Sequence, residues 1–170
     1  MKEKIFMNTE IFIEKTSEDA VLPSYAHDGD AGMDLYSVED VVIVPGQTVL
    51  VKTGLKMAIP VGMEVQIRPR SGISLNTPLR IPNAPGTIDS GYRGEVCVIL
   101  ENTSPLNSDK DGSFLTLKDK GNQKGTYKIL KGDRVAQMVV AVYAKAAFHL
   151  VEDVSGIGND REGGFGSTGV

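Results

Sequence analysis

Residues 82–100 read PNAPGTIDSGYRGEVCVIL, and this stretch predicts a β-hairpin. The first strand ends before a turn at Ser90-Gly91, because Ser and Gly are residues that tight turns favour. The chain then returns through the apolar run Val96–Leu100. This run has no polar interruption, which favours a strand that is buried on both faces. The stretch therefore points to a β-rich domain.

Strand and turn signals also dominate the sequence on both sides of this stretch. Met63, Val65 and Ile67 alternate with polar residues, which is the period of a half-buried strand. Further strands are predicted at Ile11–Ile13, Val41–Val44, Thr48–Val51 and Val135–Ala144, and one short helix at Ser71–Asn76. Turn residues recur about every 8–12 residues, as in a β-sandwich or barrel. We therefore predict an all-β fold.

The composition restricts the class of protein. The chain has 170 residues, which suit one domain, and its 18 Lys+Arg against 22 Asp+Glu give a net charge of −4, which argues against a nucleic-acid partner. The single Cys97 excludes an intramolecular disulfide. No apolar run approaches the roughly 20 residues that cross a membrane. Residues 1–15 are charged throughout and lack the apolar core of a signal peptide, so we expect a cytoplasmic protein with no membrane partner.

Two stretches differ in composition from the rest of the chain. Residues 102–127 are polar and rich in Gly, Lys, Asp and Ser, which predicts an insertion between two strands, with a small hairpin around Phe114–Leu117. Residues 155–170 are rich in Gly and poor in aliphatic residues, so we expect a flexible C-terminal arm. The predicted organisation is a β-rich core at 1–154 followed by this arm.

The predicted hairpin carries three side chains with chemistry suited to a nucleotide. Asn83 offers both a donor and an acceptor, as the edge of an amide-bearing base requires. Asp89 can act as a general base toward water. Tyr92 offers a flat apolar face on which a sugar can stack. An ordinary Asp-containing turn would explain Asp89 alone, but it explains the whole cluster less well.

Other polar residues of the sequence suit phosphate binding. The run Arg70-Ser71-Gly72 combines a guanidinium, a hydroxyl and a glycine amide, which together make an anion cradle. Gln137 interrupts an apolar strand and is either a satisfied core amide or a polar group that faces a ligand. The tail holds Arg161 and Phe165 among its glycines, so it could fold over a nucleotide. No P-loop or Rossmann phosphate motif is present in the sequence.

Taken together and in order, five segments resemble the motifs of the trimeric deoxyuridine triphosphatases (dUTPases). They are DAGMDLYS (30–37), RPRSGIS (68–74), GTIDSGYRGEV (86–96), GDRVAQMVV (132–140) and GGFGSTG (163–169). The resemblance implies a distorted jelly-roll, or β-clip-like barrel, that forms a homotrimer. It also implies that each active site takes the Asp34, Arg70-Ser71-Gly72 and Gln137 segments from one subunit, the hairpin from a second and the tail from a third.

The implied reaction is the hydrolysis of dUTP to dUMP and pyrophosphate, which keeps uracil out of DNA and supplies dUMP for dTMP synthesis. Asp89 matches the general base that activates water, and Tyr92 matches the residue that packs under deoxyribose. The implied uracil contacts come from the Asn83 side chain and from the backbone of Gly86, Thr87, Ile88 and Cys97.

The implied phosphate contacts are Arg70, Ser71 and Gly72 for the β- and γ-phosphates and Gln137 near the α-phosphate. Mg²⁺ is implied as a cofactor held by the phosphates of the substrate, with Asp34 and Gln137 near its waters. The tail residues implied at the nucleotide are Arg161, Phe165, Gly166, Ser167 and Thr168. The sequence departs from the family pattern in two places: Arg161 lies four residues before Phe165 instead of five, and the 102–127 stretch is long.

Two alternatives remain open at the level of the sequence. A dCTP deaminase has a similar fold and would need a carboxylate near the pyrimidine, for which Glu95 is the nearby candidate. A regulatory binding module would use residues 102–127 to dock a partner protein. The resemblance favours the dUTPase over both.

Overall fold

The fold of the protein is built almost entirely from short antiparallel strands. The computed structural model describes residues 8–108 and 112–159. Its elements are β1 (Phe12–Lys15), β2 (Gly32–Tyr36), β3 (Val41–Ile43), β4 (Thr48–Lys52), β5 (Leu55–Ala58), β6 (Met63–Arg68), α1 (Ser71–Asn76), β7 (Leu79–Arg80), β8 (Gly86–Ile88), β9 (Cys97–Asn102), β10 (Tyr127–Ile129) and β11 (Arg134–Val142). The all-β prediction is confirmed, and the predicted helix forms over the expected residues.

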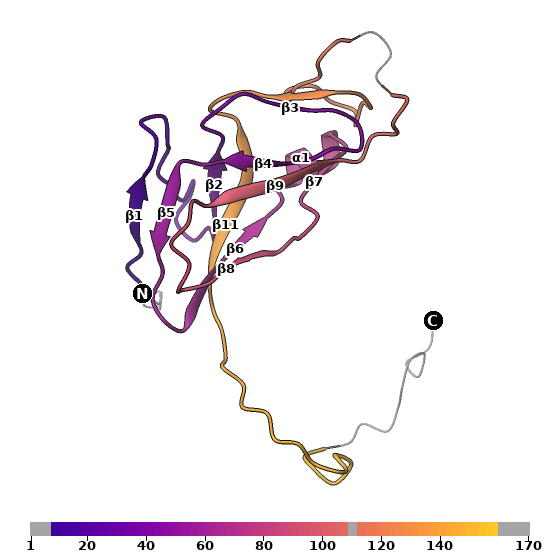
Figure 1. Cartoon of the computed structure of the whole chain (residues 1–170). Helices are drawn as coiled ribbons and strands as arrows, with labels where there is room; N and C mark the ends of the chain where they lie inside the picture. The colour runs from indigo at the N-terminus through magenta and orange to yellow at the C-terminus, as the bar shows by residue number, and fades with distance from the viewer. Residues whose placement is uncertain (1–7, 109–111, 160–170) are drawn as a thin grey trace.

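Two sheets position the residues of interest. A four-stranded sheet has the order β2-β11-β6-β8, and a three-stranded sheet has the order β4-β9-β7. The pairs β1–β5 and β3–β10 complete the strand-rich body. Every strand pair is antiparallel, and the long β11 lies in the middle of its sheet (Figure 1). This arrangement is the jelly-roll-like architecture that the sequence led us to expect.

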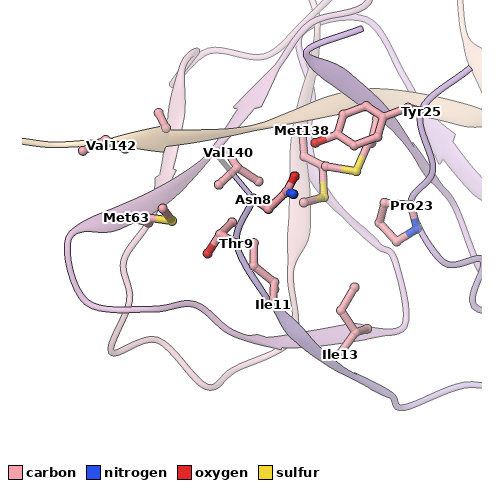
Figure 2. Close-up of a pocket in the computed structure, with 12 residues that line it drawn as sticks. Asn8, Thr9, Ile11, Ile13, Pro23, Tyr25, Met63, Met138, Val140 and Val142 are labelled. Atoms are coloured by element: carbon pink, nitrogen blue, oxygen red, sulfur yellow. The ribbon is translucent and has the colours of Figure 1, made fainter. Parts of the chain in front are cut away.

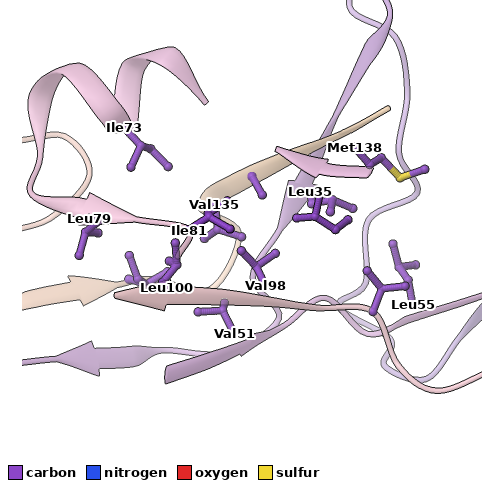
Figure 3. Close-up of a cluster of buried hydrophobic side chains, with 14 of the residues drawn as sticks. Leu35, Val51, Leu55, Ile73, Leu79, Ile81, Val98, Leu100, Val135 and Met138 are labelled. Atoms are coloured by element: carbon purple, nitrogen blue, oxygen red, sulfur yellow. The ribbon is translucent and has the colours of Figure 1, made fainter. Parts of the chain in front are cut away.

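The core is aliphatic and draws on both sheets and on the helix. Leu35 of β2 and Met138 of β11 meet Val98 of β9 there, and α1 contributes Ile73 (Figure 3). In β9 the buried side chains alternate with half-buried ones, so the strand has one face in the core and another face turned elsewhere. The prediction that both faces of this run are buried is therefore wrong, and its second face becomes important below.

The predicted hairpin at 82–100 is wrong as a pair of strands, although its turn is confirmed. The Tyr92 N–H donates to the Asp89 carbonyl at 3.0 Å, which closes a turn over Ser90-Gly91. However, β8 pairs with β6, and β9 pairs with β4 and β7. The returning chain is held by the corner after β4, because the Val96 N–H donates to the Leu55 carbonyl at 2.8 Å. The two strands therefore enter different sheets and leave a space between them.

The 102–127 stretch is attached to the body by buried polar contacts. Asn102 Nδ2 donates to the carbonyls of Ile43 (2.8 Å) and Gly125 (2.9 Å), and its Oδ1 accepts the Ser104 N–H at 3.0 Å. The small hairpin predicted around Phe114–Leu117 is wrong: those residues form an isolated parallel bridge from Leu115 to Tyr127 instead of two paired strands. The described part of this stretch is thus an irregular segment that is anchored to the core.

The chain that follows β11 leaves the body of strands (Figure 1). Every described residue from 142 to 159 is exposed, including Phe148 (94%) and Leu150 (102%). Exposed apolar side chains of this size are unusual on the surface of a single folded chain. Across residues 8–108 and 112–159, no helix has both the length and the apolar character to cross a membrane.

Candidate active site

A cavity of about 310 Å³ lies in the space between β8 and β9. It gathers seven residues that the dUTPase resemblance implied at the nucleotide: Asn83, Gly86, Thr87, Ile88, Asp89, Tyr92 and Cys97. The remaining lining residues are Leu50, Ile67, Glu95 and Ile99. The cavity thus combines apolar walls with one amide and two carboxylates, which is the composition expected of a small-molecule site.

The apolar wall follows from the alternation of β9. Val98 and Leu100 point into the core, so Cys97 and Ile99 face the cavity. Leu50 of β4 lies opposite Ile99 in the register of that pair and extends the wall. The half-buried face of β9 therefore forms the apolar wall of the cavity.

The loop after β8 places Asp89 and Tyr92 at the mouth of this cavity. The turn joins the two residues through the Tyr92 N–H, and Tyr92 Oη donates to the Glu95 carbonyl at 3.0 Å. Arg93 braces the same loop, since its Nη1 donates to the carbonyls of Ser90 (2.7 Å) and Tyr92 (2.8 Å). Both ends of the tyrosine are thereby fixed.

Two glycines make close contact with these side chains. A Cβ atom on Gly94 would lie 2.4 Å from Tyr92 Oη and 2.6 Å from its Cζ, so only glycine leaves room for the observed ring position. A Cβ atom on Gly86 would lie 3.0 Å from Asn83 Nδ2. Gly86 and Gly94 therefore shape the site because they have no side chain.

The other ionisable groups of the cavity have structural roles. Burial, and then the nearby Glu95, raise the pKa of the Cys97 thiol, so the side chain stays protonated and is no nucleophile at neutral pH. Glu95 Oε1 accepts the Gly54 N–H at 2.8 Å, which ties this carboxylate to the corner after β4.

Asp89 differs from Glu95 in this respect. Within the described residues, no hydrogen bond or ion pair engages its carboxylate, and its side chain is exposed at the cavity mouth. Its oxygens are therefore free to accept a proton from water.

The predicted phosphate residues meet elsewhere, on the four-stranded sheet. Gln137 lies opposite Asp34 on one side and opposite Arg68 on the other. Gln137 is half-buried, and its Nε2 donates to the Pro69 carbonyl at 2.9 Å. A Cβ atom on Gly32 would lie 2.4 Å from Gln137 Oε1, so the amide rests directly on this glycine.

Asp34 orients two arginines. Arg70 Nε donates to its Oδ1 at 2.7 Å, and Arg134 Nη1 donates to its Oδ2 at 3.2 Å. The Arg70–Asp34 pair is only about a quarter exposed on each side, so solvent screens it less than a surface pair. The sequence assigned Asp34 to a water network and gave no role to Arg134, although Arg134 stands within the quoted segment GDRVAQMVV.

These arginines line a second cavity, of about 240 Å³. Its lining residues are Arg70, Gly72, Ile73, Leu117, Lys118, Lys120, Asp133 and Arg134. Ser71 is exposed at the start of α1 next to this cavity but is not among the residues that line it. Sequence reasoning missed Lys118 and Lys120, because nothing in the local pattern relates the 102–127 stretch to Arg70. The predicted tail contacts Arg161, Phe165, Gly166, Ser167 and Thr168 lie outside the described residues.

The two cavities have no lining residue in common. One holds the groups suited to a base, a sugar and an attacking water, and the other holds cations suited to phosphates. A single copy of the chain therefore presents two separate cavities with different chemistry.

The described residues of the two cavities suit a metal ion that enters bound to a ligand. Among the described residues, no three His, Cys, Asp or Glu side chains come together as a metal cluster. Both oxygens of Asp34 already accept hydrogen bonds from arginine. A Mg²⁺ ion commonly binds substrate phosphates and keeps several waters, so it needs no dedicated cage of protein ligands.

A larger cavity, of about 440 Å³, carries none of the predicted site residues (Figure 2). Its lining is mainly apolar, with Met63, Met138 and Val140 on one side and Ile11 and Ile13 on another. The described residues that line it include no carboxylate, amine or guanidinium, so these residues lack the groups for hydrolytic chemistry.

Comparison with known proteins points to one protein family. The family model described as dUTPase matches residues 18–108, which is more than half of the chain. The deoxyuridine 5'-triphosphate nucleotidohydrolase of Alkaliphilus metalliredigens is 44% identical over 160 residues, covering 94% of this chain and 97% of that protein. The protein of the same name from Solibacter usitatus is 45% identical over 162 residues, covering 94% and 96%.

Solved structures of phage dUTPases share the fold. The dUTPase of Staphylococcus bacteriophage 80alpha with dUpNHpp has a TM-score of 0.84 and 30% identity, covering 96% of this chain and all of that one. A mutant dUTPase from phage phi11 of S. aureus, described with a structural Mg(II) ion, has a TM-score of 0.77 and 31% identity, covering 85% and 98%. The cavity around Asp89, the arginines around Asp34 and these relatives lead to one conclusion: the chain belongs to the dUTPase family, whose members hydrolyse dUTP to dUMP and pyrophosphate.

Proposed function

We propose that this chain hydrolyses dUTP with Asp89 as the general base. The observation that carries the proposal is the cavity that holds Asn83, Asp89 and Tyr92 together while the carboxylate of Asp89 stays unengaged by any described residue. A base must have a free lone pair and must lie beside the reacting group. Asp89 meets the first condition, and its place at the mouth of the base-and-sugar cavity supports the second.

In the proposed reaction Asp89 accepts a proton from a water molecule. The water oxygen attacks the α-phosphorus in line, the bond from this phosphorus to the bridging oxygen breaks, and pyrophosphate leaves with the electron pair. Because phosphoryl transfer depends mainly on positioning and on charge stabilisation, the protein has little further chemistry to perform. Arg70, Ser71 and Gly72 would hold the β- and γ-phosphates, and Gln137 would lie near the α-phosphate.

The proposed specificity follows from the walls of the cavity. The Asn83 amide, with backbone groups of Gly86, Thr87, Ile88 and Cys97, would read the uracil edge. Tyr92 would pack under deoxyribose and leave no room for a 2′-hydroxyl. The tight loop after β8 would also reject thymine sterically, because its 5-methyl group would have no room. We therefore expect dUTP to be preferred over UTP, dTTP and dCTP.

We further propose a homotrimer with shared active sites. The separate cavities support this, because one subunit would supply Arg70 and its neighbours while a second would supply the Asp89 loop. The exposed apolar side chains between residues 142 and 159 also suit a segment that packs against another copy. In this proposal the tail residues Arg161 and Phe165 would close over the nucleotide from a third subunit.

Mg²⁺ is the proposed cofactor, held by the phosphates of the substrate. When bound, it would offset the charge of the triphosphate and favour departure of pyrophosphate. Gln137 and Asp34 are the residues proposed to lie near its waters. In the cell, the activity would remove dUTP before it enters DNA and would supply dUMP for dTMP synthesis, and we propose that it takes place in the cytoplasm.

A pyrophosphate-release assay over several nucleotides tests the proposal. With Mg²⁺ present we expect rapid release from dUTP and little from UTP, dTTP or dCTP. Equal turnover of UTP would contradict the role given to Tyr92. Release of ammonia from dCTP, without pyrophosphate from dUTP, would instead support the deaminase alternative.

A further inference from the structure

The 102–127 segment reaches the phosphate side of the proposed site. Leu117 and two lysines of this segment line the cavity that also contains Arg70 and Arg134. Leu117 packs against the hydrophobic core, and the Asn122 N–H donates to the Asn76 carbonyl at the end of α1, at 2.8 Å. The segment is thus docked beside the helix that begins with Ser71.

A hydrogen-bonded turn holds the two lysines in place. The Asp119 carboxylate accepts the Thr116 N–H at 2.7 Å and the Thr116 hydroxyl at 2.9 Å. These bonds lower the pKa of Asp119, so its carboxylate stays charged and bonded at neutral pH. Lys118 and Lys120 flank this aspartate, and their position depends on the turn.

The cavity carries an excess of positive charge. Among the described residues that line it, four are cationic and Asp133 is the one acidic residue, while Asp34 beside the cavity pairs with both arginines. One oxygen of the Asp133 carboxylate accepts the Leu130 N–H at 2.8 Å, which holds this side chain in the turn before β11. Within the described residues, neither lysine ammonium takes part in an ion pair. This excess of positive charge favours the binding of an anion that carries more than one negative charge.

We propose that Lys118 and Lys120 bind the terminal phosphates of the nucleotide, alongside Arg70 and Arg134. The inference rests on the proposed function and extends it, since it gives the 102–127 segment a role in binding substrate. Lysine suits this task because its ammonium is a mobile point charge that can follow a phosphate chain.

The experiment compares Lys118→Gln, Lys120→Gln and the double variant with the wild-type protein. Calorimetric titration with dUpNHpp and with dUMP separates the terminal phosphates from the nucleoside. Each substitution should weaken dUpNHpp binding about three- to tenfold, and both should act together in the double variant. Binding of dUMP should stay within about twofold of wild type, because dUMP lacks the terminal phosphates. In steady-state assays KM for dUTP should rise by the same factors while kcat changes little.

Lys124→Gln is the matched control. Lys124 belongs to the same segment, but its ammonium donates to Asn122 Oδ1 at 3.0 Å and it does not line the cavity. It should bind dUpNHpp like the wild type. The inference is overturned if the wild type is active and the double variant binds dUpNHpp as Lys124→Gln does, or if dUMP binding falls equally. A wild-type protein that neither hydrolyses dUTP nor binds dUpNHpp would overturn the proposed function as well, and so the two failures are distinguishable.

Discussion

Asp89 contributes one carboxylate, yet the proposed chemistry depends on it. Replacing it by Asn keeps the size of the side chain and removes its ability to take a proton from water. We expect kcat for dUTP to fall by about 10²–10⁴. Binding of dUpNHpp, measured by calorimetry, should stay close to wild type because Asn preserves the shape of the cavity. Near-normal turnover by Asp89→Asn would remove Asp89 as the base.

Gly94 shows how a residue without a side chain can set specificity. An added methyl group would overlap the Tyr92 ring, whose Oη would lie 2.4 Å from it, so the ring must move. We expect Gly94→Ala to reduce the preference for dUTP over UTP, as a ratio of kcat/KM, by about tenfold. Gly91→Ala is the matched control, since its Cβ atom would meet nothing within 4 Å. Unchanged discrimination in Gly94→Ala would show that the ring position does not select the sugar.

Among single residues, the sequence grouped those that line the cavity between β8 and β9 better than those that line the cavity beside Arg70. Asn83, Asp89 and Tyr92 lie within ten positions of one another, so local geometry was enough to group them. Arg134, Lys118 and Lys120 were missed because their proximity to Arg70 comes from sheet pairing and from a docked segment. Such contacts join residues that are far apart in sequence, and no local pattern encodes them.

Among the elements, the 102–127 segment depends on one buried amide. Asn102 satisfies two carbonyls and one N–H that come from three different parts of the chain. Asn102→Ala removes its amide from the Ile43 carbonyl and the Ser104 N–H and leaves the Gly125 carbonyl with the longer Ser104 hydroxyl contact of 3.4 Å, which should cost about 2–3 kcal/mol of unfolding free energy. Chemical denaturation measures the loss.

Asn107 provides a control from the same segment. Its side chain is exposed, so Asn107→Ala should change the unfolding free energy by no more than about 0.5 kcal/mol. If Asn102→Ala is as stable as Asn107→Ala, then the buried network does not anchor the segment.

The strands themselves were largely predictable, but their partners were not. The alternation of apolar and polar residues located β6, and an apolar run located β9. Both patterns reflect which side chains of a strand are buried. No sequence pattern predicts that β8 pairs with β6 instead of β9. This pairing depends on a long-range contact, in which the Val96 N–H of the returning chain donates to the Leu55 carbonyl. Because β8 and β9 enter different sheets, the cavity lies between them. The feature of the fold that forms this cavity was therefore not predicted from the sequence.

For the whole molecule, shared sites predict that two inactive variants can complement each other. Asp89→Asn and Arg70→Ala should each be poorly active, because each removes one half of every site. Refolding an equal mixture should restore about a quarter of wild-type activity, since each site draws its two halves at random from the two variants. Wild type carried through the same procedure corrects for losses in refolding. No recovery beyond the separate variants would place both residues in sites within one subunit.

The most direct measurement is a crystal structure of the assembled protein with Mg²⁺ and dUpNHpp. We predict uracil and deoxyribose in the cavity of Asn83 and Tyr92, with the Asp89 carboxylate directed at a water beside the α-phosphorus. The terminal phosphates should meet Arg70, Lys118 and Lys120 of a neighbouring subunit. An Asp89 carboxylate turned away from the nucleotide, or a nucleotide bound outside this cavity, would contradict the account.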